Sequence, residues 1–425
     1  MIDRRNDNRR WKTIDDLWKD AFDDNVAALT VTNDPRQKDA FGRLRVSDTG
    51  QRLDVEFLYD KQSEYFDETT SNGTVTFNGS TRDLTLSLGD ADNGSFAKME
   101  SYPVPYTPGN SQLIDITGVL DLAGIGTGTA EIFLRTSTGG SAAESVVGQT
   151  SWVNPVSDVD WTTSQIFTMD FQSLKVGTIR FGLVRNGVIT VVHQLNNDNV
   201  RNAGYWQIPN GPVYYKLYTT GGITYMEVGY GNEANAIGFR YKVTANANAT
   251  MKAICCTVKS EGGRHLIDMP GQTFVATRSQ TAKTVSTTLV PLISIRPKST
   301  FQTYDNLILS MPKSVTLQST ESIRFAVVHN GTLTGASWAD VNTTTSSMEY
   351  DVAATVITGG HTIASDYIFA AGSGVNKGID AKAILGKTPM WYRQDSVSGI
   401  LTLAAVRTGG TDASVLAGIS WEELR

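Results

Sequence analysis

The sequence predicts an all-β protein: two tandem antiparallel β-sandwich domains of jelly-roll type, preceded by a short amphipathic helix. Three observations predict this fold class. Strand-length apolar runs rich in Val, Ile, Thr and aromatic residues follow one another at short spacing. Turn pairs such as Asn-Gly separate these runs, in a chain with 39 glycines. No helical hydrophobic period lies between the strands, so a parallel βαβ sheet is not expected.

One segment occurs twice, as Ile179–Thr190 and again as Ile323–Thr334, and seven of the twelve positions are identical. Each copy is an apolar run, then Asn-Gly, then a second apolar run. Asn-Gly tolerates the positive φ that a type I′ turn needs at both central residues, so each copy predicts a β-hairpin. A hairpin shared by the two halves indicates two related β domains.

Residues 1–49 form the predicted N-terminal arm and anchoring helix. Trp11, Ile14, Trp18 and Phe22 recur at spacings of three and four, which places them on one face of a helix. A helix this short is marginal alone, so the stripe must be buried, either on its own β domain or on another protein. In the extended segment that follows, Phe41 can be buried. Arg43 and Arg45 share one face there and could bind carboxylates.

The two domains are expected at residues 50–262 and 263–425. The boundary is placed at Glu261-Gly262-Gly263, because strand patterns on both sides are continuous while the glycines mark a change of direction. A chain of 425 residues is long enough to give each domain its own core.

Composition limits the partners. The net charge of −6 argues against nucleic-acid binding by the whole molecule, since that requires an excess of Lys and Arg. No run approaches 18 apolar residues and the N-terminus is polar, so neither membrane insertion nor a cleaved signal is expected. The two cysteines, Cys255 and Cys256, are adjacent and poorly placed to bond to each other, which favours synthesis in a reducing cytoplasm.

No catalytic constellation is evident. The four histidines have no metal-ligand spacing, and no Gly-x-Ser-x-Gly motif is present, so we expect no enzyme, no metal and no cofactor. Glu64, Asp67 and Glu68 could form the carboxylate pair of a polysaccharide hydrolase, or a solvated turn.

Aromatic residues cluster after the first hairpin. Tyr205, Trp206, Tyr214 and Tyr215 could stack on sugar rings, which makes them the glycan-binding candidates on composition. Core packing or subunit contact is the alternative.

Several stretches resemble a group of tailed-bacteriophage virion proteins that also occurs in some large algal viruses. The signature is Asp39-Ala40-Phe41-Gly42-Arg43-Leu44-Arg45-Val46-Ser47, and similar segments lie at Tyr59–Gln62, Tyr106–Gln112, Ile179–Gly187, Val192–Asn196, Val258–Gly263, Pro291–Arg296 and Asn330–Ser337. The resemblance covers most of residues 39–410. It implies a structural, head-fibre or tail-fibre-like protein of the virion and brings no catalytic residue with it.

We therefore expect a non-enzymatic bacteriophage virion protein, made in the host cytoplasm and attached to capsid or tail. Its assembly anchor would be Trp11, Ile14, Trp18, Phe22, Phe41, Arg43 and Arg45, and its partners other virion proteins and further copies of itself, since closed symmetry is common among such components. The alternative is an adhesin that binds a host-surface carbohydrate, and a polysaccharide hydrolase is a third reading.

Overall fold

The fold is described from a computed structural model that covers residues 49–125, 127–138, 141–199, 204–206, 209–261, 271–369, 375–380, 389–392 and 399–425. Within these ranges the chain is almost entirely β, with one short 3₁₀ turn, η2 (Gln149–Ser151), and no α-helix. The all-β prediction is therefore confirmed. The predicted N-terminal helix and all seven anchor residues, Trp11 to Arg45, lie outside the described residues.

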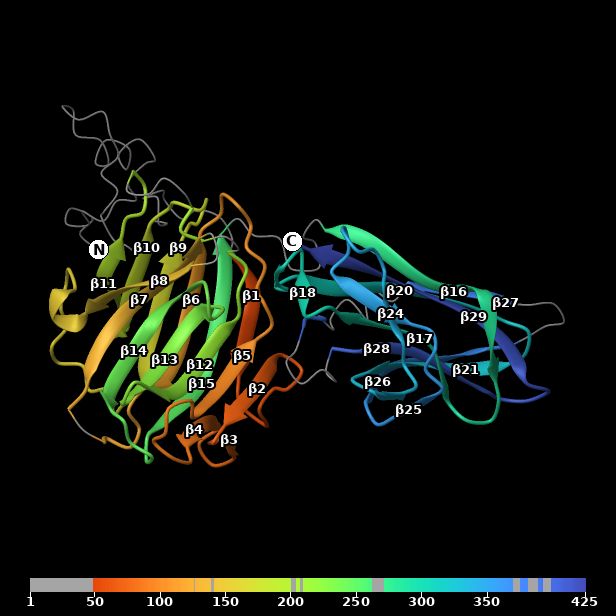
Figure 1. The fold of residues 1–425 in the computed structure, drawn as a ribbon, viewed down its shortest axis with the longest axis horizontal. Helices are drawn as coiled ribbons and strands as arrows, with labels where there is room; N and C mark the ends of the chain where they lie inside the picture. The colour runs from red at the N-terminus through yellow and green to blue at the C-terminus, as the bar shows by residue number, and fades with distance from the viewer. Residues whose placement is uncertain are drawn as a thin grey trace, which may run out of the picture.

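The first half of the chain builds two sheets that pack face to face (Figure 1). The eight-stranded sheet contains β11 (Val188–Leu195), β10 (Ile179–Arg185), β9 (Gln165–Phe171), β6 (Gln112–Val119), β15 (Thr250–Glu261), β4 (Asp83–Leu88) and β3 (Gly73–Asn78) in that order, and β1 (Thr49–Glu56) pairs with β15. The seven-stranded sheet contains β2 (Phe66–Ser71), β5 (Phe96–Ser101), β12 (Val213–Thr220), β13 (Ile223–Gly231), β14 (Ala236–Thr244), β7 (Thr129–Thr138) and β8 (Ser141–Gly148). We call this pair of sheets the first sandwich.

The second half builds a smaller pair, the second sandwich. Its four-stranded sheet contains β16 (Gln272–Val285), β29 (Ala413–Leu424), β20 (Leu309–Ser319) and β27 (Val375–Asp380). Its six-stranded sheet contains β23 (Trp338–Asp340), β24 (Met348–Asp351), β17 (Val290–Pro297), β28 (Leu401–Arg407), β21 (Ile323–His329) and β26 (His361–Ile368). Two short pairs complete it, β18 (Thr300–Phe301) with β19 (Tyr304–Asp305), and β22 (Thr332–Thr334) with β25 (Val356–Thr358). No sheet mixes described strands from before residue 262 with strands from after it.

Period-two alternation explains which faces pack. In β6, Gln112, Ile114 and Ile116 are buried whereas Leu113 and Asp115 are half-buried, as expected for a strand with one face on a core. β15 has the same pattern over Thr250–Val258, with one irregularity between Ala253 and Cys255. Every paired strand is antiparallel, so each sheet can keep one apolar face toward the core and a polar one outside.

The first predicted hairpin is confirmed. β10 pairs with β11, and Asn186 and Gly187 between them have φ of 50° and 76°, as a type I′ turn requires.

The second predicted hairpin is wrong. β21 pairs with β26 and β28, while the segment after Asn330-Gly331 forms β22 and pairs with β25 instead. The cause is visible at Asn330, whose backbone N–H donates to Ile400 O at 2.8 Å and whose Oδ1 accepts Gly399 N–H at 2.7 Å. These bonds tie Asn330 to the start of β28, and Gly331 does not take positive φ.

The two copies therefore do not share a topology, and the expected domain duplication is corrected. Phe181 and Phe325 are both buried, and both lie on a strand next to an edge strand of their sheet. However, β10 follows its inner neighbour β9 directly, whereas β21 comes before its inner neighbour β28. The shared sequence reflects a common local environment, one buried strand beside an edge.

The two sandwiches lie end to end along the long axis of the molecule and are in contact (Figure 1). Leu309, Met311, Trp391 and Leu424 of the second sandwich belong to the same apolar cluster as the core of the first. The ring centroids of Trp391 and Tyr102 are 5.8 Å apart. We call this contact region the joint.

Candidate functional site

The four glycan-binding candidates from the sequence are core residues. Tyr205, Trp206, Tyr214 and Tyr215 are each no more than 2% exposed, so a sugar cannot stack on them and that expectation is corrected. Trp206 packs edge-on against Phe171 with ring centroids 4.9 Å apart. Sequence could not distinguish this because an aromatic cluster on paired strands suits a core as well as a surface.

Tyr214 and Tyr215 point to opposite faces of β12, yet both are buried. Tyr215 faces the core and donates its hydroxyl to Cys255 O at 2.7 Å. Tyr214 lies on the outer face, flat against Gly229, where a Cβ would come within 2.7 Å of the Tyr214 hydroxyl oxygen. A glycine at 229 is therefore what allows this ring to cover the sheet.

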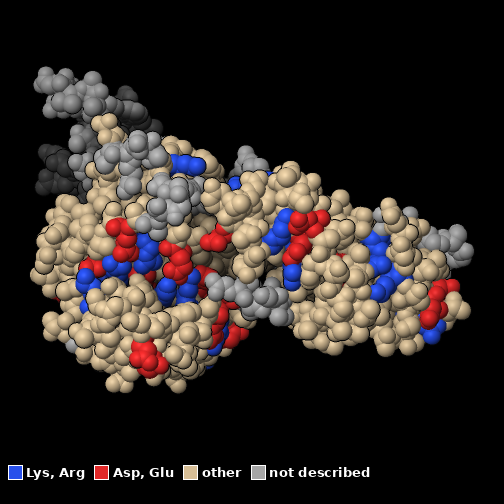
Figure 2. Space-filling model, viewed as in Figure 1, with Lys and Arg blue, Asp and Glu red and all other residues tan. Residues whose placement is uncertain are grey.

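The outer face of the seven-stranded sheet carries a dense network of charged and aromatic side chains. Glu227 is fully buried and accepts from Arg135 at 2.5 Å and from the Tyr218 hydroxyl at 2.8 Å. The rings of Tyr218 and Tyr225 stack 5.0 Å apart. Figure 2 shows acidic and basic side chains interspersed in one band across this face, without a patch of single sign.

Cations close this network from both sides. Lys216 lies 4.7 Å from the centre of the Tyr218 ring, and the Arg240 guanidinium lies 5.0 Å from that of Tyr225. The ring faces are thus occupied by neighbours within the fold. The network therefore stabilises the sheet, and the faces of the Tyr218 and Tyr225 rings are not open for a sugar to stack on.

Of the acidic residues considered for hydrolysis, Asp67 is buried, and Glu64 and Glu68 contact different side chains. Glu68 forms an ion pair with Lys61 at 2.5 Å. Glu64 lies at the joint, 3.3 Å from Nδ1 of His329 on β21. Among the residues that the structure describes, no group of three or more His, Cys, Asp or Glu side chains could hold a metal ion, and no described helix is long and apolar enough to cross a membrane.

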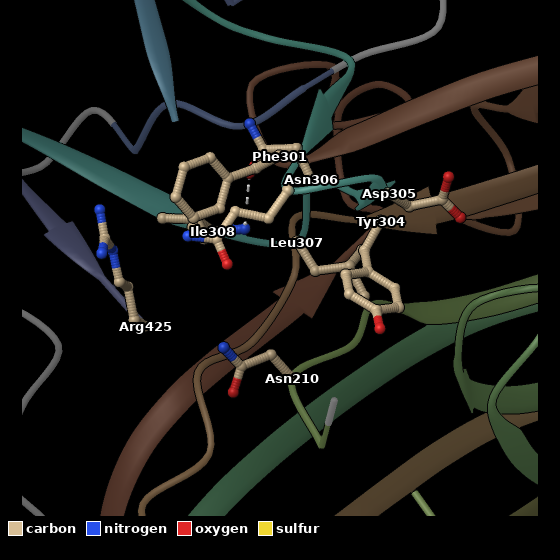
Figure 3. A pocket seen from close by; sticks show the side chains of 9 residues that line it. Asn210, Phe301, Tyr304, Asp305, Asn306, Leu307, Ile308 and Arg425 are labelled. Atoms are coloured by element: carbon tan, nitrogen blue, oxygen red, sulfur yellow. Dashed lines mark hydrogen bonds between the residues drawn. The ribbon is translucent and has the colours of Figure 1, made fainter. Parts of the chain in front are cut away.

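A pocket at the joint, lined by described residues, is a candidate site. Its cavity measures about 230 Å³ and is lined mainly by carbon atoms. Asn210 contributes from the first sandwich, and the second sandwich contributes Phe301, Gln302, Tyr304, Asp305, Asn306, Leu307, Ile308 and Arg425. Figure 3 shows the apolar side chains of Phe301, Leu307 and Ile308 facing Asn210 across the opening. We call this cavity the joint pocket.

The aromatic wall of the joint pocket stands on a strained turn. Phe301 and Tyr304 flank the turn between β18 and β19, whose central residues Gln302 and Thr303 have φ of 50° and 73°. A β-branched residue rarely takes positive φ, because its Cβ approaches the following carbonyl oxygen. Strain of this kind is maintained where the surroundings impose it, often at a binding site.

Hydrogen bonds fix the remaining wall. Asn306 Nδ2 donates to Lys298 O at 2.8 Å and to Ser347 O at 3.1 Å, and Asn306 Oδ1 accepts Ile308 N–H at 3.2 Å. Every polar atom of this side chain is used within the fold. Asn306 therefore fixes the shape of the pocket wall, and its side chain has no polar atom left to bind a ligand.

Asn210, Tyr304 and Arg425 contribute polar groups to the lining of the joint pocket. Asn210 Oδ1 accepts Tyr106 N–H at 2.9 Å, which turns its Nδ2 toward the cavity (Figure 3). Tyr304 is 53% exposed. The Arg425 guanidinium lies 5.1 Å from the centre of the Phe301 ring and is held by Glu423 at 3.0 Å. An apolar cavity with a few oriented donors at the contact of two domains is the usual form of a small-ligand site.

None of these pocket residues was singled out from the sequence. Asn210 and Tyr304 are about a hundred residues apart, and only the docking of the two sandwiches brings them together. The one local signal was the run Phe301–Tyr304, where aromatics flank a tight turn that lacks Gly or Asn.

Comparisons with known proteins give no family for this chain. No family model matches it, and no curated protein matches it. Among solved structures it is similar to an endo-1,3-beta-glucanase from Streptomyces sioyaensis, with 9% identity and a TM-score of 0.31, over 51% of this chain and 97% of that one.

Two other solved structures have similarly low sequence identities and TM-scores. A seed lectin of Lotus tetragonolobus has 11% identity and a TM-score of 0.21, over 49% of this chain and 98% of the lectin. The CBM22 tandem domain of Xyn10C from Paenibacillus barcinonensis has 11% identity and a TM-score of 0.23, over 89% and 97%. At these sequence identities and TM-scores, the similarity does not indicate a function for this chain.

Proposed function

We propose that this chain is a non-catalytic carbohydrate-binding protein carried on a virus particle, and that the joint pocket is where it binds sugar. The observation that supports the proposal is the pocket itself, in which an exposed tyrosine on the turn between β18 and β19 lies beside an oriented amide and a guanidinium. A pyranose presents an apolar face that packs on an aromatic ring and hydroxyls that accept from amide and guanidinium donors.

The size of the pocket fits a single ring. Pockets for drug-sized ligands measure ~300–1,000 Å³, so a cavity of about 230 Å³ accommodates one monosaccharide unit rather than a large molecule. The pocket holds no pair of carboxylates, since Asp305 is the one acidic side chain in its wall. The proposal therefore assigns it binding and no reaction.

The test is a glycan array probed with the full-length protein and two variants. Tyr304→Ala removes the ring that a sugar would stack on. It should weaken the binding of a glycan by ~1–2 kcal/mol, which lowers the affinity roughly tenfold. The matched control is Tyr367→Ala, which removes an exposed tyrosine on β26 of the second sandwich, outside the joint pocket. Equal binding by Tyr304→Ala and the wild type would contradict the assignment.

The second candidate is a purely structural virion component, capsid- or tail-attached, that assembles with other virion proteins and as a homo-oligomer. The joint favours it, because apolar side chains of both sandwiches share one cluster and connect them into a continuous body. The anchor would be residues 1–49, as the sequence predicts.

Changing Trp11 and Trp18 to Asp in the full-length chain tests the anchor. We expect the variant to fold, with unchanged circular dichroism, and to be missing from purified particles. Its incorporation at the wild-type level would contradict the anchor, and reducing ends released from host polysaccharide by the wild type would contradict the non-catalytic assignment.

A further inference from the structure

A second hollow shares one wall with the joint pocket. This hollow, of about 150 Å³, is lined by side chains of both sandwiches, including Lys98, Glu100, Glu233 and Tyr392, and it shares Asp305–Leu307 with the joint pocket. The segment Asp305–Leu307 thus forms part of the wall of both hollows. We call the two hollows together the joint groove.

The two ends of the joint groove differ in chemistry. The joint pocket is mainly apolar, while the second hollow exposes more polar than apolar surface. Its acidic side chains are Glu100, Glu233 and Asp305, and its basic side chain is Lys98. Lys98 pairs with Glu100 and lies 3.5 Å from Glu233, and Lys216 also pairs with Glu233, so the three acids face two lysines.

Glu233 is held as a carboxylate. Burial opposes its charge, yet Lys216 at 2.7 Å and Lys98 at 3.5 Å overcome that effect and lower the pKa of Glu233 to about 2. At neutral pH its oxygens can accept hydrogen bonds and donate none. Its side chain remains 61% exposed, so a ligand can reach it.

The neighbouring polar groups span the two sandwiches. Asn232 of the first sandwich donates its Nδ2 to Asp305 Oδ2 of the second at 3.4 Å. The Asn232 Oδ1 accepts Asn235 N–H at 2.8 Å, which fixes the amide. The second hollow thus offers hydrogen-bond acceptors held in place by the fold. The joint pocket beside it is apolar and contains hydrogen-bond donors.

Resting on the proposed function, we propose that the joint groove binds a linear oligosaccharide of at least two units that is neutral or carries amino groups, and that it rejects acidic sugars. One unit lies against Tyr304 in the joint pocket. The next extends past Asp305–Leu307 and donates hydroxyl or ammonium hydrogens to the carboxylates of the second hollow. A uronate there would face three carboxylates, those of Glu100, Glu233 and Asp305, against the ammonium groups of Lys98 and Lys216, and the excess negative charge in a partly desolvated site disfavours it.

The experiment is calorimetric titration of the full-length protein with matched sugars. The probes are glucose, galactose, mannose and N-acetylglucosamine, their β1,4- or α1,4-linked dimers, the glucosamine dimer and digalacturonate. We expect dimers to bind about tenfold more tightly than monomers. We also expect digalacturonate to bind more weakly than galactobiose, with the difference decreasing at higher salt because the repulsion is screened.

Variants separate the two hollows. Glu233→Gln should relieve the discrimination against digalacturonate and leave monosaccharide binding unchanged, whereas Tyr304→Ala should weaken monomer and dimer alike. The control Asp158→Asn alters an exposed carboxylate outside the groove, paired with Arg185, and should change neither. Equal affinity for monomers and dimers, or for digalacturonate and galactobiose, overturns this inference while leaving the proposed function intact. Absence of binding to every probe and to the glycan array overturns both.

Discussion

Removing the Glu227 carboxylate should destabilise the first sandwich strongly. Glu227 is fully buried and is the acceptor shared by Arg135 and the Tyr218 hydroxyl, with Arg240 3.6 Å away. Truncating one partner of a buried ion pair costs ~3–5 kcal/mol, because the other charge stays buried without its counter-charge. In Glu227→Ala two guanidiniums lose that partner.

The expected value lies at the low end of this range, near ~3 kcal/mol. Two other acids remain, since Glu144 accepts from Arg135 at 2.9 Å and from Arg240 at 3.0 Å, and Glu131 accepts from Arg240 at 2.9 Å. They keep both guanidiniums partly neutralised, so the lost free energy is less than for an isolated pair.

Urea unfolding followed by tryptophan fluorescence measures the change. We expect a lower midpoint with an unchanged m value, which indicates lost stability rather than a changed denatured state. The matched control is Asp158→Ala, which breaks the exposed pair with Arg185 and should change stability little, because solvent screens this pair. If Glu227→Ala costs no more than Asp158→Ala, the network does not stabilise the sheet and the reasoning is refuted.

Three further changes test the joint. Thr303→Gly should raise the free energy of unfolding by ~0.5–1 kcal/mol, since glycine adopts positive φ without strain. The control Thr300→Gly, in the adjacent strand, should lower the free energy of unfolding. If Thr300→Gly has the higher melting temperature of the two variants, the turn is not strained. Because the folded pKa of Glu233 is depressed to about 2, its contribution is present above pH ~4.5 and lost as pH falls toward 2. The difference in melting temperature between wild type and Glu233→Gln should therefore shrink over that window, and a constant difference would contradict this. Trp391→Ala should cost ~3–5 kcal/mol and increase the maximum dimension in X-ray scattering as the joint loosens; an unchanged scattering curve would argue against this contact.

The fold class was predictable because it depends on local signals. Alternating apolar positions in β6 and β15 and the Asn186-Gly187 turn act within a few residues, and the structure follows them. The hairpin predicted at the second Asn-Gly pair is wrong, because Asn330 accepts a hydrogen bond from Gly399 N–H and donates its own N–H to Ile400 O, about 70 residues away. A local signal was overridden there by tertiary contacts.

The candidate site depends on tertiary contacts more than on local sequence signals. Tyr214 and Tyr215 were chosen for their aromatic character, but burial depends on what covers each face of the sheet, and Gly229 is what allows Tyr214 to lie flat. The sequence analysis does not single out Tyr304, although its ring is exposed at the joint pocket. Whether an aromatic side chain is core or surface is a property of the packed sheets.

By itself, the sequence determined an antiparallel β architecture whose sheets change near residue 262, because hydrophobic period, turn pairs and strand length are encoded residue by residue. The tertiary structure alone decided how the strands connect and where the joint groove lies. The groove exists because Asn210 and Glu233 of one sandwich meet Tyr304 and Asp305 of the other, and no pattern in the chain records a contact made only when two folded surfaces pack together.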